Sequence, residues 1–121
     1  MARDNRPRID VESVLERYSA VSQRDYQNAC IEEAIEGINK GADVIIDLPT
    51  GTGKTLIYAP IVAEVSEKGM NALVLTATKQ AQRRVSSEIE KFQKKATQNL
   101  IYGVQEYYCP ILKSNAQNWF C

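Results

Sequence analysis

The chain has 121 residues, of which 44% are hydrophobic and 25% charged, and its 15 basic residues balance 15 acidic ones. These values are typical of a single globular domain and exclude collagen-like, coiled-coil and fully disordered chains. The zero net charge excludes a globally basic nucleic-acid binder, although it leaves room for a local basic face. The apolar stretches are shorter than the roughly 20 residues of a membrane span, so no membrane partner is expected.

Three cysteines are too few for a disulfide framework, and no apolar run follows the basic N-terminus to form an export signal. A reducing compartment is therefore expected, namely the cytoplasm, or the nucleus in a eukaryote. The chain contains no histidine, so its chemistry must proceed without an imidazole base or ligand. Because it ends on a cysteine directly after two aromatic residues, we interpret it as a truncated domain.

Two helices are predicted in the first third of the chain. Residues 1–8 are polar and basic and predict a flexible arm, after which Asp10 should cap a short amphipathic helix. The apolar residues of this first helix are Val11, Val14, Leu15 and Tyr18. Ser22 and Asp25 predict a capping box at the start of the second helix, which Gly41 should end. Its predicted core-facing stripe is Tyr26, Cys30, Ala34, Ile35 and Ile38.

From residue 44 onward, short apolar runs alternate with helical stretches. Residues 44–48, 72–76 and 100–102 predict three strands, the first two buried. A helix is expected from Lys54 to about Lys68, with Pro60 kinking it or ending it early. A further helix has one apolar face, formed by Ala81, Val85, Ile89 and Phe92. This alternation predicts an α/β fold, a parallel sheet flanked by helices.

A phosphate-binding loop is predicted at residues 48–55, which read Leu-Pro-Thr-Gly-Thr-Gly-Lys-Thr. The segment follows a predicted strand and opens a helix, as such loops do. Gly51 and Gly53 allow backbone N–H groups to converge on phosphate oxygens, helped by the positive end of the helix dipole. Lys54 can reach the β- and γ-phosphates, and the Thr55 hydroxyl can complete a Mg²⁺ shell. Leu48 departs from the pattern, which has glycine or alanine there.

The residues from Pro49 to Thr55, followed by Leu56 and Pro60, resemble motif I of superfamily 2 helicases. Upstream, Arg24-Asp25-Tyr26-Gln27 resembles the Arg-x-x-Gln element, or Q motif, of that superfamily. A glutamine amide can both donate to and accept from adenine; the alternative is that Gln27 is a polar residue on a helix surface. The resemblance implies an ATP-binding set, with Lys54 and Thr55 also catalytic and Thr55 a Mg²⁺ ligand. That set is Arg24, Gln27, Pro49, Thr50, Gly51, Thr52, Gly53, Lys54 and Thr55.

Residues 76–80 follow the second predicted strand, where these helicases place motif Ia. The resemblance implies that Thr76, Thr78 and Lys79 hold the backbone of single-stranded nucleic acid, expected to be DNA. Thr78 can also serve as a helix N-cap. Arg83 and Arg84 are expected on a solvated face.

Residues 102–110 resemble the stretch that introduces the first cluster cysteine of the XPD/DinG-like iron–sulfur helicases. Cys109 and Cys121 would then supply two of the four thiolates of a 4Fe–4S cluster, the others lying elsewhere in the full-length protein. The alternative is that Cys109 is a small buried residue and Cys121 an exposed thiol. Cys30 is expected in the core.

The resemblance implies that residues 9–121 form the first part of a RecA-like helicase ATP-binding domain, entering an iron–sulfur segment near residue 109. No Asp-Glu pair follows an apolar strand after Thr78, so the acidic Mg²⁺ residue and a second motor domain are expected elsewhere. The expected function is ATP binding within an ATP-dependent DNA helicase, and the chain alone should hydrolyse ATP poorly. Two alternatives stay open: another superfamily 2 motor (an RNA helicase or a restriction translocase), or a non-catalytic nucleotide-binding module.

Overall fold

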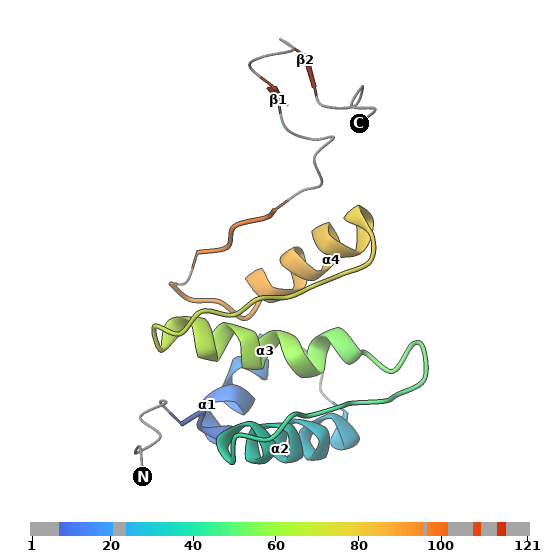
Figure 1. The fold of residues 1–121 in the computed structure, drawn as a ribbon. Helices are drawn as coiled ribbons and strands as arrows, with labels where there is room; N and C mark the ends of the chain where they lie inside the picture. The colour runs from blue at the N-terminus through green and yellow to red at the C-terminus, as the bar shows by residue number, and fades with distance from the viewer. Residues whose placement is uncertain (1–7, 21–23, 96, 102–107, 110–113, 116–121) are drawn as a thin grey trace.

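The computed structural model describes residues 8–20, 24–95, 97–101, 108–109 and 114–115. Its α-helices are α1 (Val11–Glu16), α2 (Asp25–Asn39), α3 (Lys54–Glu67) and α4 (Lys79–Glu90), and a 3-10 turn, η1 (Arg17–Ala20), follows α1. Helix α3 lies between α4 on one side and α1 and α2 on the other (Figure 1). Two short strands, β1 (Tyr108–Cys109) and β2 (Ser114–Asn115), pair antiparallel. Of the predicted arm, residues 1–7 lie outside the described part.

Asp10 caps α1, as predicted. Its carboxylate accepts from the backbone N–H of Ser13 at 2.9 Å. The helix tightens into η1 after Glu16, but Val14 and Tyr18 keep their four-residue spacing and are both buried. The side chain of Asn39 joins the entry of α1 to the end of α2, since its Nδ2 donates to the Ile9 carbonyl at 2.8 Å and its Oδ1 accepts from the Ile9 N–H at 2.9 Å.

Helix α2 begins later than predicted, and of its predicted core-facing residues only Ala34 and Ile35 are buried. Its N-cap is Arg24 and not Ser22, so the predicted capping box is wrong. The buried residues are Gln27, Ile31, Ala34 and Ile35. Tyr26 and Ile38, which were expected in the core, are 38% and 40% exposed. The helix ends at Asn39, and Gly41 closes it as predicted, because the N–H groups of Gly41 and Ala42 donate back to the carbonyls of Ile38 and Gly37.

Helix α3 runs without interruption through Pro60, so the prediction of an early end is wrong. Pro60 has no N–H to donate to the carbonyl of Leu56 four residues earlier. That carbonyl accepts instead from the hydroxyl of Tyr18. Because a neighbouring element satisfies the orphaned acceptor, the helix can keep its proline in the middle of the molecule. The buried residues of α3 are Ile57, Ala59, Pro60, Ile61, Ala63 and Glu64.

The predicted N-cap of α4 is confirmed, whereas Phe92, predicted on the apolar face of this helix, lies two residues beyond its end at Glu90. The Thr78 hydroxyl caps it by accepting from the N–H of Ala81 at 3.1 Å. Ile89 and Phe92 are buried at its other end, and the Phe92 ring meets the Tyr18 ring edge-on with centroids 5.3 Å apart. Arg83 and Arg84 are exposed, as predicted for a solvated face.

Within the described residues, the segments predicted as strands form no strands and do not pair with one another. Residues 42–48 run back along α2 and residues 70–77 run back along α3 (Figure 1). Ile45, Leu73 and Leu75 are 92%, 78% and 82% exposed. Tyr102, at the end of the third predicted strand, lies outside the described residues. The parallel sheet therefore stays a prediction.

Candidate functional site: the phosphate loop at the start of helix α3

The predicted phosphate loop turns sharply between residue 48 and α3. Gly51 and Gly53 have φ angles of 83° and 80°, the left-handed region that glycine enters without steric cost. The hydroxyl of Thr52 donates to the Pro49 carbonyl at 2.7 Å and closes the turn around Gly51. Gly53 is the N-cap of α3, so the helix begins at Lys54.

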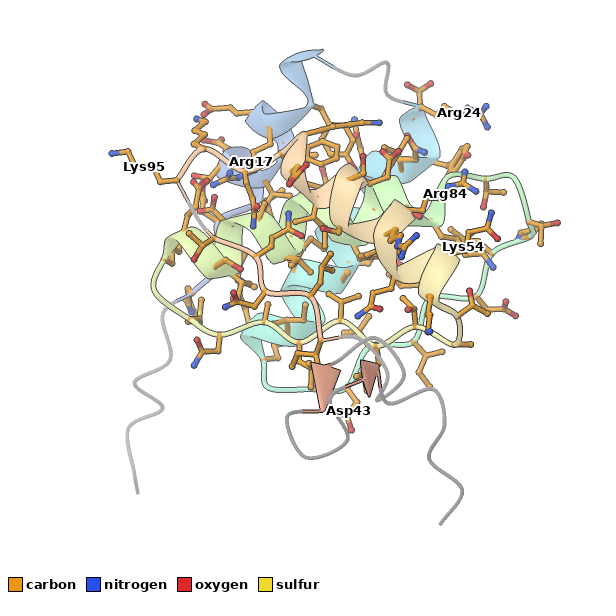
Figure 2. The ribbon with its side chains drawn as sticks, turned by 90° about the horizontal axis from the view of Figure 1, so that it is seen from above. Arg17, Arg24, Asp43, Lys54, Arg84 and Lys95 are labelled. Carbon is orange, nitrogen blue, oxygen red and sulfur yellow. The ribbon has the colours of Figure 1, made fainter. Side chains whose placement is uncertain are left out.

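The start of α3 presents unpaired backbone donors. Among the described residues, no acceptor is present for the N–H groups of Gly53, Lys54 and Thr55. The first N–H groups of a helix point out of its end and carry its positive partial charge. Lys54 is exposed and Thr55 is half-buried in the same turn. In Figure 2, Lys54 and Arg24 lie toward the same side of the molecule.

The first turn of α2 packs onto this loop. The carbonyl oxygen of Thr52 accepts two hydrogen bonds, from the hydroxyl of Tyr26 at 2.6 Å and from Nε2 of Gln27 at 3.2 Å. The other amide atom of Gln27 accepts from the backbone N–H of Arg24 at 3.1 Å. Gln27 is only 1% exposed, so the alternative that it lies on a helix surface is wrong. Its contact with adenine stays a prediction, since both of its amide atoms are bonded within the chain.

The loop fits a triphosphate. Converging N–H groups, a lysine and a helix N-terminus are the groups that hold phosphate oxygens in proteins. For Mg²⁺ the chain offers the Thr55 hydroxyl, and the described residues contain no cluster of three or more acidic, cysteine or histidine side chains. Mg²⁺ on a nucleotide keeps several waters and takes most other ligands from phosphate, so one hydroxyl is compatible with such a site.

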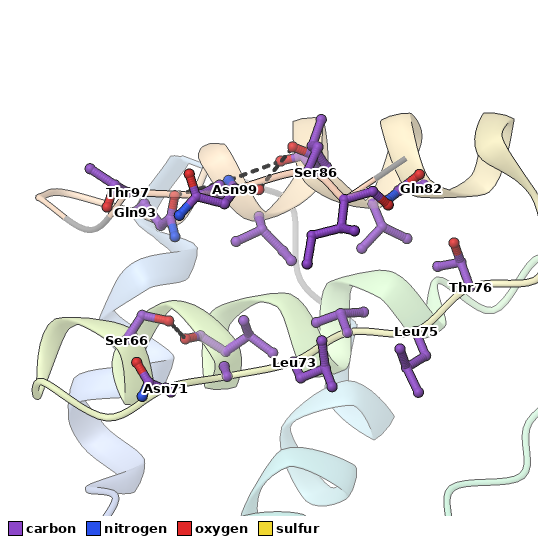
Figure 3. Close-up of a pocket in the computed structure, with 18 of the residues that line it drawn as sticks. Ser66, Asn71, Leu73, Leu75, Thr76, Gln82, Ser86, Gln93, Thr97 and Asn99 are labelled. Carbon is purple, nitrogen blue, oxygen red and sulfur yellow. Dashed lines mark hydrogen bonds between the residues drawn. The ribbon is translucent and has the colours of Figure 1, made fainter. Parts of the chain in front are cut away.

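The residues predicted to hold nucleic acid gather at the start of α4. Thr76, Thr78 and Lys79 are all exposed, and the Thr76 hydroxyl donates to the Thr78 carbonyl at 3.3 Å. They line one end of a cavity of about 920 Å³ between the 70–77 segment and α4, shown in Figure 3. Leu73 and Leu75 form one wall, and Ser86 lies on the other. The residues of the phosphate loop do not line this cavity.

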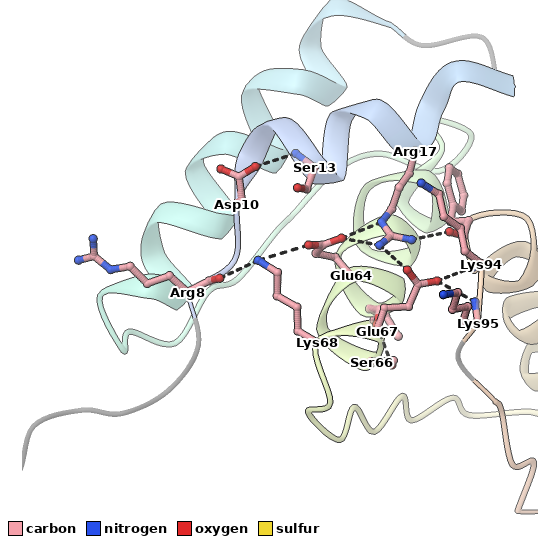
Figure 4. A network of polar contacts seen from close by, with 12 residues as sticks. Arg8, Asp10, Ser13, Arg17, Glu64, Ser66, Glu67, Lys68, Lys94 and Lys95 are labelled. Carbon is pink, nitrogen blue, oxygen red and sulfur yellow. Dashed lines mark hydrogen bonds and ion pairs between the residues drawn. The ribbon is translucent and has the colours of Figure 1, made fainter.

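A charged cluster, defined as Arg17, Glu64, Glu67 and Lys68, joins η1 to the end of α3 (Figure 4). The guanidinium of Arg17 donates to both Glu64 and Glu67 and to the Phe92 carbonyl at 2.8 Å. The hydrogen bond from Arg17 and those from two backbone N–H groups lower the pKa of Glu67 to about 2, against the effect of burial. Burial lowers the pKa of Arg17, but its bonds to the two carboxylates outweigh burial and raise it.

Two contacts in the structure could not be predicted from the sequence: the ion pair of Glu64 and the contact of Tyr26 with the loop. Glu64 lies inside the longest apolar stretch, around 56–65, and a carboxylate at such a place requires a cationic partner. That signal predicts a buried ion pair, but it does not identify Arg17 as the partner. Tyr26 stands within the Arg-x-x-Gln element, yet nothing in the spacing indicates that its hydroxyl reaches the loop.

The predicted iron–sulfur residues are only partly described. Cys109 lies in β1, and Cys121 lies outside the described residues. Cys30, which was expected in the core, is a free thiol that is only half-buried and packs against the edge of the core. None of the described helices is long and apolar enough to cross a membrane.

The glycine loop leads into a helix that begins with Lys-Thr, and a helix that begins after Arg24 packs on the loop, as predicted for a fragment of a superfamily 2 helicase. A family model described as "Type III restriction enzyme, res subunit" matches residues 20–118, and the chain belongs to this family.

Three relatives illustrate the similarity. The chain is 36% identical over 92 residues to the DEAD-box ATP-dependent RNA helicase RhpA of Helicobacter pylori (strain B128), a match that covers 71% of the chain and 19% of the relative. It is 38% identical over 64 residues to the DEAD-box ATP-dependent RNA helicase CshC of Bacillus cereus, covering 50% of the chain and 16% of the relative. It is 23% identical over 108 residues to the probable ATP-dependent helicase MJ0942 of Methanocaldococcus jannaschii, a match that covers 89% of the chain and 17% of the relative.

The chain thus spans less than a fifth of the length of these curated relatives. No solved structure matches it.

Proposed function

We propose that this chain is the ATP-binding part of an ATP-dependent motor that moves along or separates nucleic acid. The observation that carries the proposal is the loop before α3, where the N–H groups of Gly53, Lys54 and Thr55 have no acceptor among the described residues. A helix start of this kind is stabilised by an anion. The family match and the ATP-dependent helicase relatives support the phosphate tail of ATP as that anion.

Each loop residue has a role in this proposal. Residues 49–53 shape the backbone, the N–H groups at the start of α3 bind phosphate oxygens, and Lys54 neutralises the β- and γ-phosphates. The Thr55 hydroxyl ligates Mg²⁺, which would offset the negative charge that develops on the phosphates during transfer. Arg24 and Gln27 lie next to the loop, where a bound nucleotide would place its base. The acidic Mg²⁺ residue and the second motor domain would come from elsewhere in the full-length protein.

Two observations favour different nucleic-acid partners. The match to the res subunit of type III restriction enzymes supports DNA, with Thr76, Thr78 and Lys79 holding its backbone. The 36% identity to an RNA helicase supports RNA as the second candidate. Single-stranded DNA and RNA, added separately to the full-length protein, should stimulate ATP hydrolysis to different extents. Stimulation by DNA alone supports the first candidate, and stimulation by RNA alone supports the second.

The parallel sheet is also a proposal. We infer that residues 44–48, 72–76 and 100–102 pair in the full-length protein, because they carry exposed apolar residues such as Ile45 and Leu73 that a sheet would cover. Backbone N–H groups of paired strands exchange slowly with solvent. Hydrogen exchange in the full-length protein should therefore be slow in all three segments, and fast exchange there would contradict the sheet.

The iron–sulfur cluster is the finer proposal for residues 109 and 121. A 4Fe–4S cluster needs four thiolates, so the full-length protein would supply two further cysteines. Iron analysis and the visible absorption spectrum of anaerobically purified full-length protein test this, and a colourless, iron-free protein that hydrolyses ATP would contradict it.

The proposed function is tested with Lys54→Ala in the full-length protein, using a fluorescent ATP analogue. Loss of the lysine charge should weaken binding more than about tenfold, because the ammonium faces the phosphates directly. Lys40→Ala is the matched control, since Lys40 is an exposed lysine at the end of α2, paired with Glu36. Equal affinities of the wild type and Lys54→Ala would remove the loop from the nucleotide site.

A further inference from the structure

The Thr52 carbonyl is held at both of its lone pairs by consecutive residues of α2. Tyr26 and Gln27 donate to it at 2.6 Å and 3.2 Å. A carbonyl oxygen has two lone pairs, so these two bonds saturate it. The two donors reach the loop from a helix about 25 positions earlier in the chain, so the contact is made by the packing of α2 on the loop.

The direction of the Tyr26 hydrogen bond is determined by Arg24. Nη1 of Arg24 lies 3.1 Å from the Tyr26 hydroxyl oxygen. A guanidinium can only donate, so the phenol oxygen is the acceptor of that bond. The single phenol proton is then left for the Thr52 carbonyl. The three groups form a chain of hydrogen bonds that runs from Arg24 through Tyr26 to the loop.

Holding this carbonyl also orients a phosphate-binding N–H group. The peptide bond between Thr52 and Gly53 is trans, so the N–H of Gly53 points opposite to the Thr52 carbonyl. With the carbonyl turned toward α2, that N–H faces away from α2 and has no acceptor among the described residues. A flip of this peptide would break both hydrogen bonds and turn a carbonyl oxygen toward the bound anion.

The tight packing around Gly53 also restricts the peptide bond between Thr52 and Gly53. A Cβ atom at this position would lie 2.8 Å from Nε2 of Gln27, closer than real Cβ contacts. The amide of Gln27 therefore packs directly against the residue whose N–H it helps to orient. Gln27 is buried, whereas Tyr26 is 38% exposed at the rim of the loop.

We propose that Tyr26 is a positioning residue for the triphosphate, which holds the 52–53 peptide with its N–H toward the phosphates whatever base the nucleotide carries. This inference rests on the proposed function, because it takes the loop as the phosphate site. It assigns Tyr26 to the phosphate tail and not to recognition of adenine.

The test measures the affinity of the full-length protein for three probes: ATP, GTP and inorganic tripolyphosphate. Tyr26→Phe removes the hydroxyl and keeps the ring. It should weaken the binding of all three probes by the same factor, about fivefold for one lost hydrogen bond. The melting temperature of the nucleotide-free protein should change little, because the side chain lies at the surface of the loop. Tyr58→Phe, which removes a hydroxyl from the second turn of α3, is the control and should leave the three affinities unchanged.

Two results would overturn the inference: unchanged affinity of Tyr26→Phe for all three probes, or a loss confined to ATP, which would place Tyr26 at the base. Lys54→Ala separates this failure from failure of the proposed function. If Lys54→Ala loses its affinity for tripolyphosphate and Tyr26→Phe keeps its affinity, only the positioning role of Tyr26 is wrong. If Lys54→Ala binds all three probes as the wild type does, or the wild type binds none, the loop is not a phosphate site and both proposals fail.

Discussion

The hydroxyl of Tyr18 donates to the carbonyl oxygen of Leu56 in the first turn of α3. This carbonyl would normally accept from the N–H of the residue four positions later, which is Pro60 and has none. Burial raises the pKa of Tyr18 above its usual range, so the phenol keeps its proton and stays a donor. One tertiary hydrogen bond thus replaces the helical bond that the proline removes.

This arrangement predicts a coupling between the two positions. Tyr18→Phe should lower the free energy of unfolding by about 1–3 kcal/mol, because it leaves a partly buried carbonyl without a donor. In a Pro60→Ala background the alanine N–H can satisfy Leu56, so the same substitution should cost clearly less. Urea denaturation of the four proteins in this cycle measures the coupling. If Tyr18→Phe lowers the free energy of unfolding equally in both backgrounds, the Tyr18 hydroxyl and the N–H at position 60 do not compete for the Leu56 carbonyl.

The two loop glycines predict different outcomes for the same substitution. Gly51 and Gly53 both have left-handed backbones, so alanine should cost about 1–2 kcal/mol of strain at either position. At Gly51 a Cβ would meet nothing within 4 Å, whereas at Gly53 it would lie 2.8 Å from Nε2 of Gln27. Gly53→Ala should therefore weaken ATP-analogue binding more than Gly51→Ala. Titration of both variants of the full-length protein checks this, and the reverse order would contradict the geometry.

The charged cluster predicts a large cost for Arg17→Met. The substitution keeps an apolar stem but leaves Glu64, whose side chain is 6% exposed, without its main partner. Removing one member of a buried ion pair typically costs about 3–5 kcal/mol. Adding Glu64→Gln should recover much of the loss, since the uncompensated charge disappears. Lys40→Met, which breaks the exposed pair with Glu36, is the control and should change the denaturation midpoint little.

The lowered pKa of Glu67 predicts a loss of stability in acid. The pKa falls from 4.5 to about 2 in the folded protein, chiefly because Arg17 binds the carboxylate. The unfolded chain takes up this proton first as the pH falls, so the contribution is present above about 4.5 and is lost between about 4.5 and about 2. The difference in stability between the wild type and Glu67→Gln should shrink over this interval. A difference that stays constant there would contradict the shift.

The parts of the fold that depend on neighbouring residues could be predicted from the sequence. The caps at Asp10 and Thr78 and the end of α2 at Gly41 each involve groups within five residues, so spacing alone reveals them. The N-cap of α2 is local too, since the Arg24 N–H donates to Gln27 three residues later, but arginine is not among the residues preferred at an N-cap, so the prediction fell on Ser22. The hydrogen bond from the Gln27 amide to the Thr52 carbonyl is a contact that local spacing cannot reveal.

By itself, the sequence determined that a glycine loop opens a helix at Lys54, because Gly51 and Gly53 stand where the backbone takes left-handed angles. Only the tertiary structure decided which distant groups complete that site and the core beneath it. The bonds from Tyr26 to Thr52 and from Arg17 to Glu64 exist because α2 and η1 pack against α3 and its loop. Such contacts depend on how helices are placed in space, and residue spacing along the chain carries no record of that placement.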